Sequence, residues 1–226
     1  MNRLTKLIMV LPALGLASCT GSLFQSKAAP PTIYMLPAGG GSAAPATASA
    51  PASAAPTAAA PNAEIPVDLA ILKPRVRTGL ESERIAVLYP DRRLDYFADA
   101  RWSGPLGEVL QDLTVQEFHS HAHFRTISGD ASVFASAYWL EIEVTDFQAE
   151  YASAAQAPTV HVHLLARIGS SGDRRIMGQF VADAREPAAE NRLGAIVDAY
   201  ARAADTALAQ IAADVSATLA KNSEAR

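Results

Sequence analysis

The sequence predicts an α+β domain in which an antiparallel sheet of about five strands packs with a mid-chain helix and a long C-terminal helix. Three observations predict this fold class. Apolar and polar residues alternate in several segments between Val67 and Ala184, as in half-buried strands. Apolar residues recur every three or four positions after Pro105 and again after Pro187, as on one helix face. A Gly- and Ser-rich cluster at 169–173 separates two strand-like segments, as in a hairpin.

The first 18 residues have the layout of a secretory signal peptide, with a basic start, an apolar run from Leu7 to Leu16 and small residues before Cys19. The apolar run is shorter than the roughly 20 residues that a membrane span needs. Cys19 is the only cysteine, and Leu-Ala-Ser-Cys resembles a bacterial lipobox. This motif implies cleavage before Cys19 and its acylation, by palmitate for example. The alternative is an ordinary signal peptide that happens to contain a cysteine.

The charge balance is mildly acidic. The chain has 19 Lys and Arg against 23 Asp and Glu, and loss of residues 1–18 would remove Arg3 and Lys6 but no acidic residue. Nucleic-acid binding needs a clustered basic surface, so a nucleic-acid partner is not expected. The same balance argues against polybasic adhesion to a membrane, so membrane contact is expected through the acyl chains.

Residues 19–63 are predicted to form an acylated tether before a single domain at 64–226. The tether contains a short strand at 32–37, expected to join the domain's sheet as an edge strand that Pro37 terminates. Residues 39–62 are almost all Gly, Ala, Ser, Thr and Pro, which predicts a disordered linker that holds the domain away from the bilayer. An Ala-rich helix is the alternative, but four spaced prolines oppose it.

The domain's elements follow from its pattern of apolar residues. A helix is predicted from Pro105 to about His119 and another from about Pro187 to Ala220, both on one face of the sheet. The apolar stripe of the second helix is expected to pack on its own sheet, with a coiled-coil seam as the alternative. The strands are predicted at 67–72, 84–89, 94–102, 138–147, 159–168 and 175–184.

Two histidines are weak candidates for metal ligands. His161 and His163 would share one face of a strand, about 6.6 Å apart. Histidine is a common metal ligand, but a solvated strand face is the simpler interpretation. The sequence contains neither a Gly-x-Ser-x-Gly elbow nor a Gly-x-x-x-x-Gly-Lys phosphate loop. The prediction is therefore no catalytic residue, no metal site, no cofactor and no enzymatic activity.

Charged and aromatic residues interleave between Tyr89 and Trp102, as they do at protein interfaces. Arg93, Tyr96, Arg101 and Trp102 are the candidate interaction residues. In the alternative interpretation the aromatic residues lie in the core while the charges pair at the surface.

Three features together resemble the ABC-type transport auxiliary lipoprotein family, which includes the auxiliary lipoprotein of the Pqi system. They are the lipobox at Cys19, the Tyr34-Met35-Leu36-Pro37 motif, and the stretch from Leu94 to Trp102 that leads into the helix at Pro105. The resemblance implies an accessory lipoprotein that acts by protein docking. Its partners would be an MCE-domain protein, which moves lipids or other hydrophobic compounds between membranes, and a separate ABC permease and ATPase.

Residue Thr20 bears on location, because in enteric-type sorting an aspartate at that position favours the inner membrane. Its absence predicts an outer-membrane lipoprotein facing the periplasm. Two alternatives stay open: a lipid-binding carrier with its own cavity, and an outer-membrane assembly or structural lipoprotein without a transport role. Self-association into a homo-oligomer is also left open.

Overall fold

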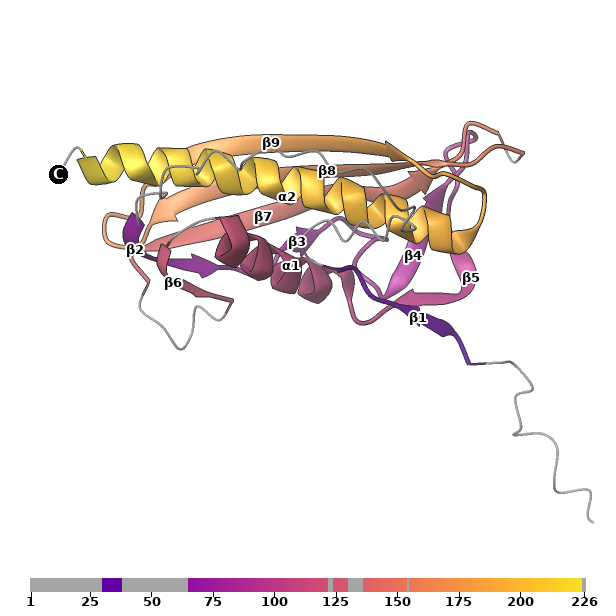
Figure 1. The fold of residues 1–226 in the computed structure, drawn as a ribbon, viewed down its shortest axis with the longest axis horizontal. Helices are drawn as coiled ribbons and strands as arrows, with labels where there is room; N and C mark the ends of the chain where they lie inside the picture. The colour runs from indigo at the N-terminus through magenta and orange to yellow at the C-terminus, as the bar shows by residue number, and fades with distance from the viewer. Residues whose placement is uncertain (1–29, 38–64, 122–123, 130–135, 154, 225–226) are drawn as a thin grey trace, which may run out of the picture. The chain divides into compact units, whose positions relative to one another are not determined.

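The computed structural model describes residues 30–37, 65–121, 124–129, 136–153 and 155–224, in which two helices pack on a nine-stranded sheet (Figure 1). The helices are α1 (Leu106–His121) and α2 (Leu193–Glu224). The strands are β1 (Thr32–Tyr34), β2 (Ile65–Ile71), β3 (Arg75–Val76), β4 (Arg84–Leu88), β5 (Leu94–Trp102), β6 (Phe124–Ser128), β7 (Tyr138–Glu150), β8 (Thr159–Ser170) and β9 (Ile176–Pro187).

The α+β class is confirmed, but the sheet is larger than predicted and it is mixed. Its strand order is β1-β5-β4-β7-β2-β6, with β3 and β8 also on β7 and β9 on β8. Strand β7 pairs parallel with β2, β3 and β4 and antiparallel with β8. Parallel neighbours need a crossover connection, and α1 lies in the crossover that brings β6 back parallel to β2. The two-residue β3 and the poorly alternating β6 gave no strand signal.

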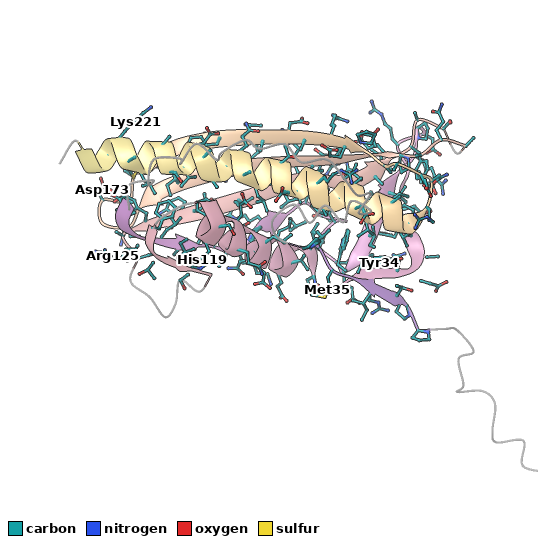
Figure 2. The ribbon with its side chains drawn as sticks, viewed as in Figure 1. Tyr34, Met35, His119, Arg125, Asp173 and Lys221 are labelled. Atoms are coloured by element: carbon teal, nitrogen blue, oxygen red, sulfur yellow. The ribbon has the colours of Figure 1, made fainter. Side chains whose placement is uncertain are left out.

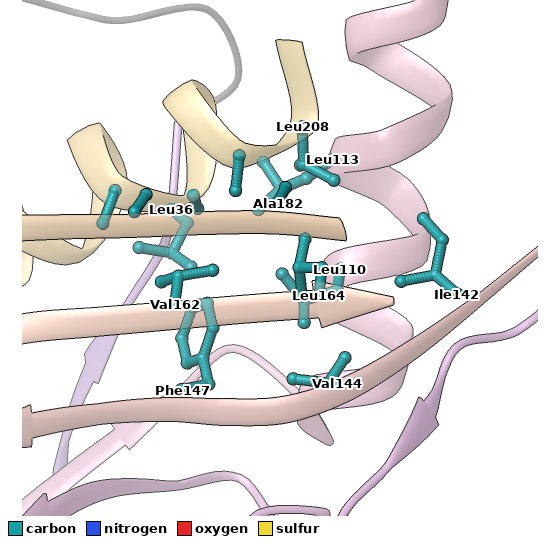
Figure 3. Close-up of a cluster of buried hydrophobic side chains, with 14 of the residues drawn as sticks. Leu36, Leu110, Leu113, Ile142, Val144, Phe147, Val162, Leu164, Ala182 and Leu208 are labelled. Atoms are coloured by element: carbon teal, nitrogen blue, oxygen red, sulfur yellow. The ribbon is translucent and has the colours of Figure 1, made fainter. Parts of the chain in front are cut away.

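The predicted meander is present as β7, β8 and β9, joined antiparallel. Strand β7 buries alternate side chains on the face toward the helices, including Leu140, Ile142 and Val144, of which Figure 3 labels the last two. Strand β9 buries Ala182 and Ala184 on the same face. Val160, Val162 and Leu164 of β8 are also buried on this face. The residues between them belong to the outer face of the strand, as the alternating pattern predicts.

Both helices cover the same face of the sheet, as predicted (Figure 1). Helix α2 packs on β8 and β9 and also contacts α1. Its stripe from Val197 to Leu219 is buried in the protein's own core, not offered to a coiled-coil partner. The helix begins at Leu193, later than predicted, because β9 continues to Pro187. No helix among the described residues is long and apolar enough to span a membrane.

Strand β1 pairs parallel with β5, with Thr32 opposite Ala100 and Tyr34 opposite Trp102. It lies at the edge of the sheet, as predicted, although it ends at Tyr34 before the expected Pro37. Leu36 continues inward and is buried in the core. The segment from Thr32 to Leu36 is therefore built into the folded domain.

This pairing changes the role expected of the Ala/Pro stretch. Residues 39–62 lie outside the described residues, but the strands before and after them, β1 and β2, belong to one sheet. The stretch therefore connects two strands of the domain and is not the spacer between Cys19 and the domain. Only the residues between Cys19 and β1 separate the predicted anchor from the sheet.

Candidate interaction surface

The four candidate residues do not form one surface. Trp102 is only 1 % exposed and packs edge-on against Phe147 and Tyr200, with ring centroids 6.1 and 5.2 Å away. A side chain in that position cannot contact a partner, so the assignment of Trp102 to an interaction surface is wrong. It lies in the core because its register opposite Tyr34 turns it toward the helices.

Tyr96 and Arg101 are occupied by neighbours within the fold. The Tyr96 hydroxyl donates a hydrogen bond of 2.7 Å to the carbonyl of Gly79, and the Arg84 guanidinium lies 3.8 Å over its ring. Arg101 Nη1 lies 2.7 Å from Glu83 Oε1. Both residues brace β5 against the segment before β4, which favours the alternative in which the charges pair at the surface.

Arg93 is the candidate that lies on an open surface. Its guanidinium lies 4.5 Å over the ring of Tyr89, which in turn stacks on Tyr151 with a centroid separation of 5.7 Å and an interplanar angle of 16°. Arg93 is 59 % exposed at its side chain, while both tyrosines are half-buried. We call Tyr89, Arg93 and Tyr151 the tyrosine–arginine cluster.

Three connections of the fold meet at this cluster. Tyr89 and Arg93 belong to the β4–β5 hairpin, and Tyr151 follows β7 immediately. The Tyr151 hydroxyl donates a 2.6 Å hydrogen bond to Oδ1 of Asn191, which precedes α2. Figure 1 shows the ends of β4 and β7 at the same end of the molecule. The stack is thus fixed from two sides before any partner binds.

The hairpin geometry holds Arg93 in place. The amide of Arg92 donates to the carbonyl of Tyr89, which closes a turn with Pro90 at its first central position. Arg92 then has φ 65°, the left-handed residue of a turn that ends in a bulge. The amide of Arg93 also donates to Asp91 Oδ1, so the turn pre-sets the Arg93 side chain beside the tyrosine stack.

Replacing Arg92 with glycine is expected to raise the free energy of unfolding by up to about 1 kcal/mol, because glycine adopts φ 65° without a Cβ clash. Urea denaturation measures the change. Asp91→Gly is the control, since Asp91 has no positive φ and glycine there should destabilise the hairpin. A destabilising Arg92→Gly would contradict the strain assignment.

Arg93 remains accessible to solvent although two carboxylates lie beside its guanidinium. Its guanidinium lies 3.6 Å from Asp91 and 3.3 Å from Asp95, both substantially exposed, so these pairs contribute little to stability. Partial burial, with a smaller contribution from Tyr89, raises the pKa of the Tyr151 phenol. The raised pKa keeps the Tyr151 phenol neutral near pH 7, and the two tyrosine rings offer aromatic surface with polar tips. Rigid Tyr and Arg side chains of this kind are enriched among interface hot spots.

Tyr151 is the functional candidate that the sequence did not reveal. It lies far along the chain from Tyr89, at the end of β7, and only the parallel pairing of Leu88 with Glu150 brings the two together. Because the two tyrosines meet through a parallel pairing of distant strands, no pattern within either segment indicates their contact.

The two histidine candidates lie on the outer face of β8. Nδ1 of His161 is 3.0 Å from Glu150 Oε1, and Nε2 faces Asp183 at 3.3 Å. The Arg185 guanidinium is 3.1 Å from Nδ1. A metal cation at His161 would meet this positive charge, so the arrangement favours an ion-pair network. His163 hydrogen-bonds Thr145 instead.

Among the described residues, no group of three or more His, Cys, Asp and Glu side chains is placed to hold a metal ion.

Glu150 makes this network sensitive to acid. Burial alone would raise its pKa, but hydrogen bonds from Arg185 and Gln148 and the nearby His161 outweigh burial and leave the pKa below the ordinary 4.5. A carboxylate with a lowered folded-state pKa adds stability that is present above the unfolded-state value and lost as the pH falls through the folded-state value.

Glu150→Gln is therefore expected to lower stability at neutral pH and to narrow the gap between neutral and acid stability. Urea midpoints at about pH 7 and at pH values below 4.5 measure both effects. Glu190→Gln is the control, because among the described residues Glu190 forms its ion pair with the nearby exposed Arg192. If the difference between neutral and acid urea midpoints narrowed equally in both variants, Glu150 would have no special part in the acid response.

The described residues thus combine an α+β domain with an exposed tyrosine–arginine cluster at one end of the sheet. The chain belongs to the ABC-type transport auxiliary lipoprotein component family, whose model matches residues 48–212. This family is defined by a role beside a transport system and not by a catalytic activity. Membership also implies a lipid-anchored location in the cell envelope.

Solved structures agree with the fold. The chain is similar to protein XCC0632 from Xanthomonas campestris, with 21 % identity, a TM-score of 0.65 and coverage of 71 % of this chain and 90 % of that one. An uncharacterized protein gives 15 % identity and a TM-score of 0.58, covering 83 % of this chain and 100 % of that one. Hypothetical protein CT253 from Chlamydia trachomatis gives 12 % identity and a TM-score of 0.50, covering 68 % of this chain and 98 % of that one. No curated protein sequence matches the chain.

Proposed function

We propose that this protein is an outer-membrane lipoprotein, acylated at Cys19 and facing the periplasm, that docks an MCE-type ABC transport system for lipids or other hydrophobic compounds. Family membership supports the role beside a transporter. The observation that carries docking is the tyrosine–arginine cluster, because it is exposed at Arg93, fixed by the hairpin and by Asn191, and not used in the core. The MCE-domain protein is the proposed direct partner.

The carrier alternative has less support, because among the described residues the core between helices and sheet is packed with side chains. Trp102, Phe147 and Tyr200 pack together at one end of the core (Figure 3 shows Phe147 among its neighbours). The hollow that Pro37, Leu113 and Leu208 line between the helices has a volume of about 10 Å³, room for one water molecule and not for an acyl chain.

Affinity capture from detergent-solubilised membranes tests the proposal. The acylated full-length protein should recover an MCE-domain protein with its permease and ATPase. Arg93→Glu should abolish recovery, because it reverses the charge over the Tyr89 ring.

Arg175→Glu is the matched control. Arg175 is 69 % exposed at its side chain and lies 3.7 Å from Asp173, much as Arg93 lies beside Asp91, but it follows the turn between β8 and β9 at the end of β8 away from Tyr151 (Figure 2 labels Asp173). Recovery of no transport component by the unaltered protein would overturn the function. If the Arg93→Glu variant recovered as much MCE-domain protein as the unaltered protein, docking through the tyrosine–arginine cluster would be overturned.

A further inference from the structure

The segment that enters the fold first is apolar on both of its faces. Tyr34 and Leu36 point into the domain, while Ile33 and Met35 alternate outward and are 63 and 74 % exposed. Met35 directly follows β1, and Figure 2 labels it at the surface of the domain. These are the two most exposed large apolar side chains of the described residues, and they lie two positions apart. The other three, Leu94, Ile176 and Val181, lie on other strands.

The position of this pair along the chain determines what can cover it. Ile33 is the fourteenth residue after Cys19, and the long Ala/Pro stretch lies on the far side of β1. Fourteen residues span at most about 50 Å when fully extended and roughly 20 Å as a coil. An acylated Cys19 would therefore deliver β1, before any other element, to the bilayer surface.

The chemistry of the connecting residues also suits a lipid interface. Between Thr20 and Pro37 the chain carries one charge, Lys27, and it includes Leu23 and Phe24. Half-buried Tyr34 belongs to the residue types that collect at the membrane–water boundary. A segment with apolar side chains and one cation matches a bilayer better than the charged surface of a soluble partner.

We propose that Ile33 and Met35 insert into the bilayer interface and form a second membrane contact beside the acyl chains. This proposal rests on the acylation of Cys19 in the proposed function. Tethering makes the contact intramolecular, so two side chains suffice where they would not bind a membrane alone. Because β1 is hydrogen-bonded to β5, the contact would fix the edge of the sheet at the membrane and limit the orientations of the domain.

Depth-dependent quenching tests the proposal on the acylated full-length protein in phosphatidylethanolamine–phosphatidylglycerol vesicles. Met35→Cys supplies a free thiol for an environment-sensitive fluorophore, since acylation occupies the thiol of Cys19. Val181→Cys is the matched control, because Val181 is 53 % exposed on β9, which within the described part of the chain is an edge strand paired with β8. Doxyl-labelled lipids are expected to quench the probe at position 35 severalfold more than the probe at position 181.

Equal quenching at both positions would overturn the inserted contact. A blue-shifted probe at position 35 without doxyl quenching would also overturn it, because a second copy or another protein would then cover β1. Mass spectrometry of the same sample reports acylation of Cys19 separately. Acylated protein without quenching refutes only this inference, whereas unacylated protein refutes the anchor in the proposed function.

Discussion

Replacing Trp102 with alanine is expected to lower the free energy of unfolding by about 3–5 kcal/mol, the cost of removing a large aromatic side chain from a packed core. Trp102 contacts Phe147 and Tyr200 edge-on and lies at the β5 position that pairs with Tyr34. The cavity would open where β1, β5 and α2 meet, and these elements cannot close around it without breaking strand pairing. Urea denaturation followed by circular dichroism measures the loss.

Trp139→Ala is the matched control for this prediction. Trp139 is half-buried on the outer face of β7, where its ring covers Gly169 of β8 instead of filling the core. Its removal leaves an open surface and not a cavity, so the loss is expected to be clearly smaller. Equal losses in the two variants, or a nearly neutral Trp102→Ala, would contradict the placement of Trp102 in the core.

The second large effect concerns Cys19. Replacing it with alanine, in a chain secreted by an ordinary cleavable signal peptide, is expected to release essentially all of the protein from the membrane. Each buried methylene of an acyl chain contributes about 0.8 kcal/mol to membrane binding, and stable anchoring needs more than one lipid or basic signal. The two exposed side chains of Ile33, in β1, and Met35, directly after it, cannot replace that energy.

Fractionation of membranes after a carbonate wash measures the release. Thr20→Asp is the control, because it keeps Cys19 and should leave the protein in membranes while it redirects the protein toward the inner membrane. If the Cys19→Ala chain stays in the washed membrane pellet, acylation at Cys19 is not what holds the protein there.

Sequence patterns within single segments predicted the buried faces of individual strands and helices. Period-two alternation in β7 and β8 located their buried faces, and the spacing of Val197, Tyr200 and Ala204 located the buried stripe of α2. The edge placement of β1 was also predictable, since β-branched and aromatic residues before Pro37 favour a short edge strand. These features depend on neighbours within one segment.

The remainder depends on contacts between distant segments. The parallel pairing of Leu88 with Glu150 creates the Tyr89–Tyr151 stack, and no property of either segment specifies it. Trp102 was assigned to a surface because charged residues surround it in sequence, whereas its register on β5 directs it inward. Of the four candidate residues, only Arg93 remained on an open surface.

The most direct test of the central claim is photo-crosslinking in living cells. A photoreactive amino acid at position 93 should form a covalent adduct with an MCE-domain protein, identified by mass spectrometry, and the same amino acid at position 173, on the turn between β8 and β9, should not. An adduct with the MCE-domain protein from position 93 alone is the predicted result. Adducts from position 173 but not 93, or none with any transport component from either position, would contradict docking through the tyrosine–arginine cluster.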